Sequence, residues 1–222
     1  MNSLASTLLY VLLALLAVAL GYAVLSLPDE PGGLSGIVAS QMGNSGVGHP
    51  VTAVLLNFRA YDTLLEMAVL LLALLGVWSL TLRIPSERSA SISPVLGTLL
   101  RLLAPVMVLV AGYLLWVGAH APGGAFQAGS VLAAAGVLLL LCGKRLEGRL
   151  AAWPLRVALV LGCAMFVAVA AAVILGGGEL LQYPLESAGT LILLIETAAT
   201  LSIGITLVAL FLGVRPTIER DR

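Results

Sequence analysis

Long apolar runs with almost no charged residues constrain this chain more than any other feature of its sequence. Six of them cover roughly residues 4–27, 63–82, 94–117, 125–142, 155–175 and 188–213. As helices with a rise of about 1.5 Å per residue, they reach about 27 Å or more, enough to cross the hydrocarbon layer of a bilayer. The predicted fold class is therefore all-α, a polytopic transmembrane helical protein with about six spans.

The composition agrees with this class and excludes several others. Of 222 residues, 60% are apolar and 10% are charged, whereas soluble domains carry about 25% charged residues. Zero net charge and the lack of a basic stripe argue against a nucleic-acid partner. No P-loop, dinucleotide fingerprint or nucleophile elbow is present, and little chain lies outside the apolar runs, so we do not expect an enzyme.

Neither a metal site nor a cofactor is expected. Cys142 and Cys163 lie in or at the end of apolar runs, and their spacing resembles no metal or redox motif. They are interpreted as small packing residues. His49 and His120 are the two histidines, too few for a zinc site without carboxylate ligands.

The basic residues predict the orientation of the spans. The run 4–27 is longer than the core of a signal peptide, with no Lys or Arg before it, so it is interpreted as a retained first helix. If the N-terminus is cytoplasmic, Arg59 is the single basic residue outside, and both termini are cytoplasmic. The ten basic residues then inside are Arg83, Arg88, Arg101, Lys144, Arg145, Arg149, Arg156, Arg215, Arg220 and Arg222.

A short polar segment divides the chain into two predicted units. The linker RIPSERSASISP (83–94) follows a two-span unit, 1–82, and precedes a four-span unit, 95–222. Within the first unit, the apolar octet VTAVLLNF (51–58) is too short to cross a bilayer. It either lies along the membrane interface or forms a re-entrant half-helix packed against protein.

The stretch FRAYDTLLE (58–66) places charges at the start of the second span. Thr63 and Glu66 have the spacing of a capping box, and Arg59, Asp62 and Glu66 can meet if the turn is helical. One interpretation is a capped helix with an ion pair at the outer interface. The other is a group of ion-path or proton-path residues, with Glu66 buried near the path.

Glu196 is an acid inside the last apolar run. A carboxylate inside hydrocarbon costs about 2.5–3.5 kcal/mol or more. Hydroxyl side chains at Thr197, Thr200 and Ser202 lie close by, and Thr200 shares its face of a helix at i+4. Glu196 is therefore a second candidate for a proton or ion path, with Thr200; the alternative is a protonated carboxyl group bonded across to another helix.

The segment GAHAPGGAFQAGS (118–130) joins the third and fourth runs. Pro122, Gly123 and Gly124 rule out a regular helix there, while Phe126 and Gln127 begin the fourth run. One interpretation is a tight outer turn with His120 and Gln127 as polar anchors. The alternative is a broken helix whose N-terminal N–H groups face a cavity.

Small residues recur every four positions in two runs, which lets helices approach closely. They are Ala125, Gly129 and Ala133 in one run, and Ala164, Ala168 and Ala172 in the other. Packing within the chain explains one stripe, and two stripes make contact with other membrane proteins of a complex plausible.

Two of these motifs resemble known families. GAHAPGGAFQAG resembles the glycine-rich signature of the MnhB domain, which forms the B-type component of Mrp-type (Mnh, Pha) multisubunit Na⁺/H⁺ antiporters. NFRAYDTLLEMAVLLLALLGVWSL (57–80) resembles the C-terminal part of the large A-type antiporter component and the small E-type component of membrane-bound hydrogenases. The residues that carry the first match are Gly118, His120, Pro122, Gly123, Gly124, Phe126, Gln127 and Gly129.

The chain departs from both signatures at identifiable positions. Ala125 and Ala128 replace glycines, and His120 lies one place after the family's histidine position. In the second motif, Asn57 and Leu65 replace an aspartate and a glycine. Arg59, Asp62, Thr63 and Glu66 match the family pattern.

The resemblance implies one component of a multisubunit monovalent cation (Na⁺)/proton antiporter related to complex I. It further implies a multi-pass protein of a prokaryotic plasma membrane, with other membrane subunits as partners and Na⁺ and H⁺ as transported ions. Glu66 corresponds to a family acid implicated in ion translocation. The alternatives are the equivalent component of a redox-driven complex of the membrane-bound hydrogenase type, or a purely structural scaffold.

Overall fold

The computed structural model describes residues 3–27, 33–80, 94–142 and 152–213, and every regular element in these ranges is helical. The chain forms two compact units, Met1–Ile37 and Val38–Arg222. The helices are α1 (Ser3–Leu25), α2 (Ser35–Gln41), α3 (Pro50–Ala53), α4 (Ala60–Ser79), α5 (Pro94–Val117), α6 (Ala125–Leu141), α7 (Ala152–Leu175) and α8 (Leu185–Leu212). A 3₁₀ turn, Met42–Asn44, follows α2, and a π-helical turn, Val54–Phe58, follows α3.

The predicted all-α membrane fold is confirmed. Within the described ranges, five helices are long and apolar enough to cross a membrane, and α6 is a shorter apolar helix of 17 residues. The predicted spans agree with α1 and with α4 to α8 to within a few residues at each end. Most of the linker 83–94 and most of the basic residues that predict the orientation lie outside the described residues.

The first unit contains α1. Its candidate span, Thr7–Leu25, has no residue buried within the chain. All of its side chains from Thr7 onward are exposed, including Leu12 and Leu16. A helix that is apolar all round removes its side chains from water only in lipid or against other protein. Helix α1 therefore has the character of a membrane span.

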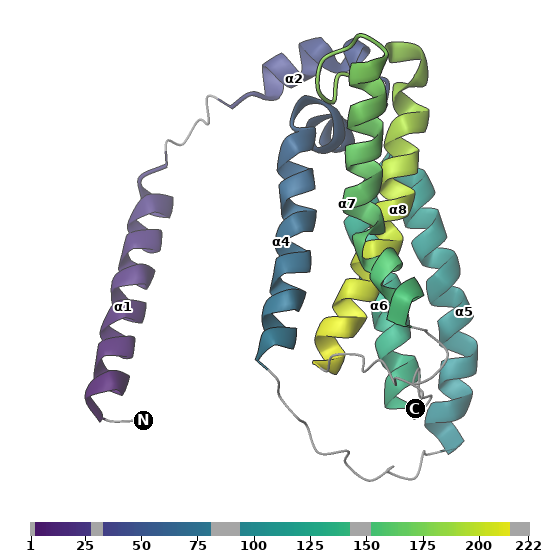
Figure 1. The fold of residues 1–222 in the computed structure, drawn as a ribbon. Helices are drawn as coiled ribbons and strands as arrows, with labels where there is room; N and C mark the ends of the chain where they lie inside the picture. Colours follow the sequence, from purple (N-terminus) through teal and green to yellow (C-terminus); the bar gives the residue numbers. More distant parts are fainter. Residues whose placement is uncertain (1–2, 28–32, 81–93, 143–151, 214–222) are drawn as a thin grey trace. The chain divides into compact units, whose positions relative to one another are not determined.

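Helix α8 forms the centre of the second unit. It is the most buried candidate span, with 56% of its apolar window inside the chain, against 11% for α5. Helices α6 and α7 pack along it, α5 packs on α6, and α4 lies against α7 and α8 (Figure 1). Phe166 of α7 and Ile192, Ile195 and Ile203 of α8 are almost completely buried.

Small residues bring α6 close to α8. A Cβ atom added to Gly129 would lie 2.9 Å from Ile203, and one added to Gly204 would lie 3.3 Å from the Gly129 carbonyl oxygen. Ala125 and Ala133 are buried in the same contact. The first stripe of small residues therefore serves packing inside the chain, because only small side chains allow this approach.

The second stripe lies on the outside of the chain. Ala164, Ala168 and Ala172 are all exposed on α7, whereas Val169 and Ala170 of the same helix are buried. The two stripes therefore differ in environment.

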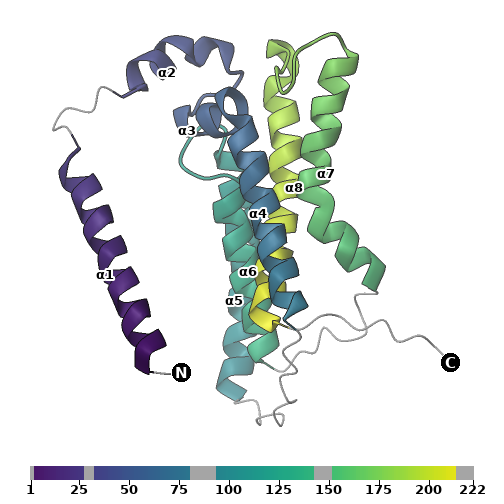
Figure 2. The same cartoon turned by 60° about the vertical axis from the view of Figure 1, so that its left-hand side comes forward.

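The segment after α2 covers the turn between α5 and α6. The backbone N–H groups of Gly48 and His49 donate to the Ala119 carbonyl at 2.9 and 3.0 Å, and the Thr52 hydroxyl donates to the Gly118 carbonyl. In Figure 2, α7 and α8 continue beyond α5 and α6 at the end where α3 lies. One side of the octet 51–58 is thus packed against protein, with Ala53 and Leu56 buried, while Val51, Leu55 and Phe58 are exposed.

Candidate functional site

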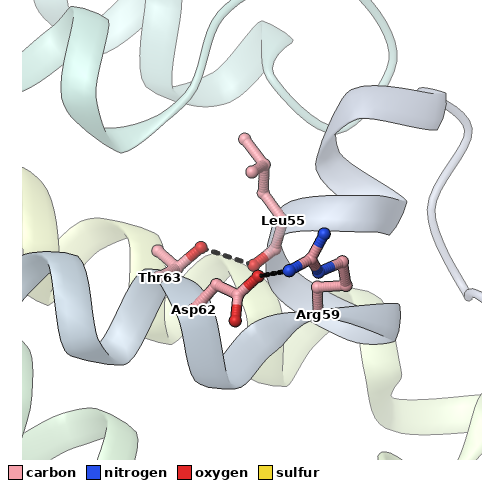
Figure 3. Close-up of polar contacts among 4 residues, drawn as sticks. All are labelled: Leu55, Arg59, Asp62 and Thr63. Carbon is pink, nitrogen blue, oxygen red and sulfur yellow. Dashed lines mark hydrogen bonds and ion pairs between the residues drawn. The ribbon is translucent and has the colours of Figure 1, made fainter.

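The start of α4 is set by a wide turn rather than by a capping box. The N–H of Arg59 donates to the Val54 carbonyl at 2.8 Å, which closes the π-helical turn, and α4 begins at the next residue. The Thr63 hydroxyl donates to the Leu55 carbonyl at 2.6 Å (Figure 3). The predicted Thr63–Glu66 capping box is wrong, because Thr63 lies inside the helix and its hydroxyl bonds to the preceding turn.

Two of the three predicted charged residues meet. The side chains of Arg59 and Asp62 form an ion pair at 2.5 Å and remain 63% and 52% exposed (Figure 3). This is the one ion pair among the described residues. Arg59 has backbone angles of φ −129° and ψ 35°, so it does not extend α4 by a helical turn toward Glu66.

Glu66 points away from the helical core. The buried residues of α4 are Ala60, Thr63, Met67 and Leu74, and Glu66 is exposed on another side of the helix. It lies six residues after Ala60, about 9 Å along a candidate span. Within this chain, Glu66 is therefore not the buried acid that the ion-path interpretation described.

Glu196 is the one buried acid among the residues that the structure describes. Its side chain is 3% exposed, and it lies 11 residues after Leu185, about 17 Å along α8. The backbone N–H of Ala125 hydrogen-bonds to its carboxyl group. The second carboxyl oxygen, Oε2, is buried and has no hydrogen-bond partner among the described residues.

Gly124 makes room for this carboxyl group. It precedes α6 with φ 108°, a conformation that favours glycine, and an added Cβ atom would lie 2.8 Å from Glu196 Oε1. A side chain at this position would therefore be strained and would displace the carboxyl group. The N-terminus of α6 and the middle of α8 meet at the glycine.

The other turn glycines are also required by close contacts. A Cβ atom on Gly118 would lie 2.7 Å from the Gly124 nitrogen, and one on Gly123 would lie 2.5 Å from the Leu114 carbonyl oxygen. The Gly124 N–H donates to that same carbonyl at 2.9 Å. The turn is tight, and the N–H at the start of α6 bonds to the buried Glu196 carboxyl group rather than facing a cavity.

The remaining motif residues have different environments. His120, Pro122 and Gln127 are exposed, Phe126 is half-buried, and Gly129 is buried against α8. The structure therefore brings Gly124, Ala125 and Glu196 together, and the side-chain oxygen of the exposed Gln127 lies 3.7 Å from a Cβ atom added at Gly124.

The hydroxyl groups near Glu196 bond to the backbone. Thr200 donates to the Glu196 carbonyl at 2.7 Å, and Thr197 donates to the Leu193 carbonyl at 2.7 Å. Ser202 donates to the Leu159 carbonyl of α7 at 2.6 Å. Thr200 thus contacts the backbone of Glu196, and its hydroxyl proton is committed to that carbonyl.

An open cleft of about 540 Å³ lies at the end of the second unit that holds the loops, and Leu193, three residues before Glu196 on α8, lines it. One wall belongs to the α5–α6 turn, with Ala119 and His120, and another belongs to α8, with Gly189, Thr190 and Leu193. Residues 42–48 complete it. This segment is not among the predicted site residues, and the glycines of SGVG (45–48) are its signal in the sequence.

Two protein families match this chain, one over each half. Residues 95–214 match "Domain related to MnhB subunit of Na+/H+ antiporter", and residues 3–95 match the MbhE family, the E-type component of MBH. A search of curated proteins gives no match.

Two solved structures have similar folds. A chain in the structure of the Mrp complex from Dietzia sp. DQ12-45-1b has a TM-score of 0.71 and 24% identity, over 100% of this chain. The chain described here spans only 27% of that longer chain. A chain of the membrane-bound sulfane sulfur reductase, an archaeal respiratory membrane complex, has a TM-score of 0.68 and 28% identity, over 92% of this chain and 97% of its own length.

The first family match covers more than half of the chain, and its range includes α6, α7, α8 and the glycine turn. The protein belongs to the family of domains related to the MnhB subunit of the Na⁺/H⁺ antiporter.

Proposed function

We propose that this chain is an integral membrane subunit of an Mrp-type multisubunit Na⁺/H⁺ antiporter, in which it helps to assemble the complex and contributes to the ion path. In this role the chain itself is not an enzyme and holds no cofactor. It lies in a prokaryotic plasma membrane with both termini cytoplasmic. Support comes from the family match over residues 95–214 and from the fold shared along the chain with part of an Mrp complex.

The observation that carries the proposal is the exposure of Glu66 on a candidate membrane span. Glu66 has no ion pair within the described part of the chain. A carboxylate facing lipid costs about 2.5–3.5 kcal/mol at the centre of a span and less toward its ends, so contact with polar groups of another subunit would stabilise Glu66. An acid at the boundary between two subunits is well placed to contact a transported cation or proton.

The experiment compares Glu66→Gln with Glu179→Gln in the complete complex. Glu179 is an exposed acid in the loop between α7 and α8, so it controls for the loss of one carboxylate. The genes of the complex are expressed in a bacterium without its own antiporters, and Na⁺-dependent proton movement is measured in everted vesicles. We expect Glu66→Gln to lower exchange by about tenfold or more, while the control keeps the wild-type rate.

Assembly of each complex is checked by native electrophoresis. If Glu66→Gln assembles and exchanges ions at the wild-type rate, Glu66 has no role in transport and a scaffold role is favoured. Loss of assembly would instead assign Glu66 to the contact between subunits.

The second candidate is the corresponding component of a redox-driven membrane complex. The match to a chain of the archaeal reductase complex over 97% of that chain favours it. Isolation of the protein from native membranes with its companions separates the two candidates. Antiporter proteins alone support the first, and nickel–iron or iron–sulfur proteins support the second.

A further inference from the structure

We propose that Glu196 and the N-terminus of α6 form a proton-binding site within this chain, and that protons reach it from the cleft lined by His120 and Leu193. This inference deepens the proposed function and rests on it for the use of the proton. The binding site itself depends only on the contacts of Glu196, and it can be measured separately.

Both charge states of the Glu196 carboxyl find support in the structure. Helix α6 begins at Ala125, whose N–H bonds to the carboxyl group, and the positive end of a helix dipole favours a carboxylate. Ala125, which contacts the carboxyl group, and Ile192, Ile195 and Ala199, within about one turn of Glu196 on α8, are buried apolar residues, and such surroundings favour the neutral acid. A group that is supported in both states can gain and lose a proton without a large change in structure.

Oε2 is the atom at which the proton would bind. It is buried without a partner among the described residues, although buried polar atoms nearly always have one. As a carboxylate oxygen it lacks a donor, and as an acid O–H it lacks an acceptor. A mobile proton carrier such as water, entering beside Oε2, completes the site in either state.

Proton binding fits this site better than binding of a metal cation. A hard cation requires about six oxygen ligands, and Oε2 is the one unpartnered buried carboxylate oxygen among the described residues. The hydroxyl of Thr200 is already bonded to a backbone carbonyl. The positive end of α6 also disfavours a metal ion at this position.

No charged side chain among the described residues is paired with Glu196. The charged residues on the helices packed against α8 are Asp62, Glu66, Arg101 and Arg156, and all four are exposed. The remaining titratable residues on these helices are Tyr61 and Tyr113, which are exposed, and Cys163, which is half-buried. Apolar surroundings and the start of α6 therefore govern the charge of Glu196.

The cleft provides an approach for protons. Leu193, which lines it, lies three residues before Glu196, about one helical turn along the same side of α8. Ala119 and His120 line the other wall and belong to the turn that ends at Gly124, against the Glu196 carboxyl. Both walls therefore contain residues that lie close in the chain to a contact of Glu196: Leu193 on α8, and the turn residues that lead to Gly124.

Infrared difference spectroscopy of the purified complex tests the site directly. Between acidic and alkaline buffer, we expect the wild type to lose the carbonyl band of a protonated buried carboxyl group. Glu196→Gln should lack this change, because its amide still accepts the Ala125 hydrogen bond but does not titrate. Glu186→Gln, which removes an exposed acid at the start of the same helix, should retain it.

Three outcomes overturn the proposal. One is the same band in Glu196→Gln as in the wild type. Another is loss of the wild-type band on addition of Na⁺ at constant pH, which would assign a metal cation to the site. If Glu196→Gln does not assemble, Glu196→Asp keeps an acid on a shorter side chain and must shift the band or its pH midpoint. An unchanged band in Glu196→Asp is the third contradicting outcome.

The proposed function fails independently of this result. If the wild-type complex shows the Glu196 band but no Na⁺/H⁺ exchange, the antiporter role is contradicted and the proton-binding site still stands. If the Glu196→Gln complex exchanges ions at the wild-type rate, the site has no role in transport, but the antiporter role of the complex still stands.

Discussion

At the scale of single residues, Tyr183 is a buried polar group without a partner among the described residues. It lies just before α8, its side chain is 6% exposed, and its hydroxyl group makes no hydrogen bond within the described part of the chain. Burial raises the pKa of Tyr183 to about 12. An unsatisfied buried hydroxyl lowers stability by about 1–3 kcal/mol relative to a satisfied one.

We therefore predict that Tyr183→Phe stabilises the protein modestly at neutral pH, by up to about 1 kcal/mol. The difference should grow in alkaline buffer. The folded-state pKa of Tyr183 is above its ordinary value of 10.0, so the wild-type side chain contributes instability as pH rises from about 10 toward 12. Melting temperatures of the purified wild type and variant at several pH values measure both effects.

Tyr113 provides the control, because it is exposed on α5. Tyr113→Phe should leave the alkaline part of the stability curve unchanged. A Tyr183→Phe protein that is less stable than the wild type at neutral pH would show that the hydroxyl group does have a partner in the assembled protein.

At the scale of helices, the approach of α6 to α8 depends on glycine. We predict that Gly129→Ala destabilises the protein by about 1–3 kcal/mol, because the added methyl group would lie 2.9 Å from Ile203 in a well-packed contact. Gly112→Ala is the matched control on α5, where an added Cβ has no atom within 4 Å. The control should be neutral or slightly stabilising, since alanine favours helix over glycine.

Thermal unfolding of the two purified variants measures this difference. Equal melting temperatures for Gly129→Ala and Gly112→Ala would mean that α6 can move away from α8 at little cost.

At the scale of the whole molecule, the surfaces left open on the candidate spans predict contacts with other subunits. Ala164, Ala168 and Ala172 form an exposed stripe of small residues on α7, and such stripes let helices approach closely. We predict that Ala168→Leu weakens assembly of the complex and leaves the fold of this chain intact. Ala134→Leu, at an exposed alanine on α6, is the control.

Native electrophoresis of solubilised membranes measures the fraction of chain found in the complex. Full assembly of Ala168→Leu would show that the stripe faces lipid, in which case α7 contacts no other protein of the complex through these residues.

The sequence by itself determined the helices and the class of protein. Apolar runs of this length have one physical solution in a bilayer, so the spans at 94–117 and 125–142 agree closely with α5 and α6. The Arg59–Asp62 pair also followed from spacing, because the Asp62 N–H bonds to the Arg59 carbonyl and closes a turn in which residues three apart are neighbours. The glycine motif and the acidic stretch were sufficient to indicate the family.

Only the tertiary structure decided which acid is buried and what it contacts. Glu66 and Glu196 both lie in apolar runs, but Glu66 is exposed whereas Glu196 is buried, with 3% of its surface exposed. The difference arises because burial depends on which helix faces are covered by neighbours. The contact of Glu196 with Gly124 and Ala125 joins positions about seventy residues apart. Neither helical periodicity nor composition carries information about such a contact, since it depends on how α6 packs on α8.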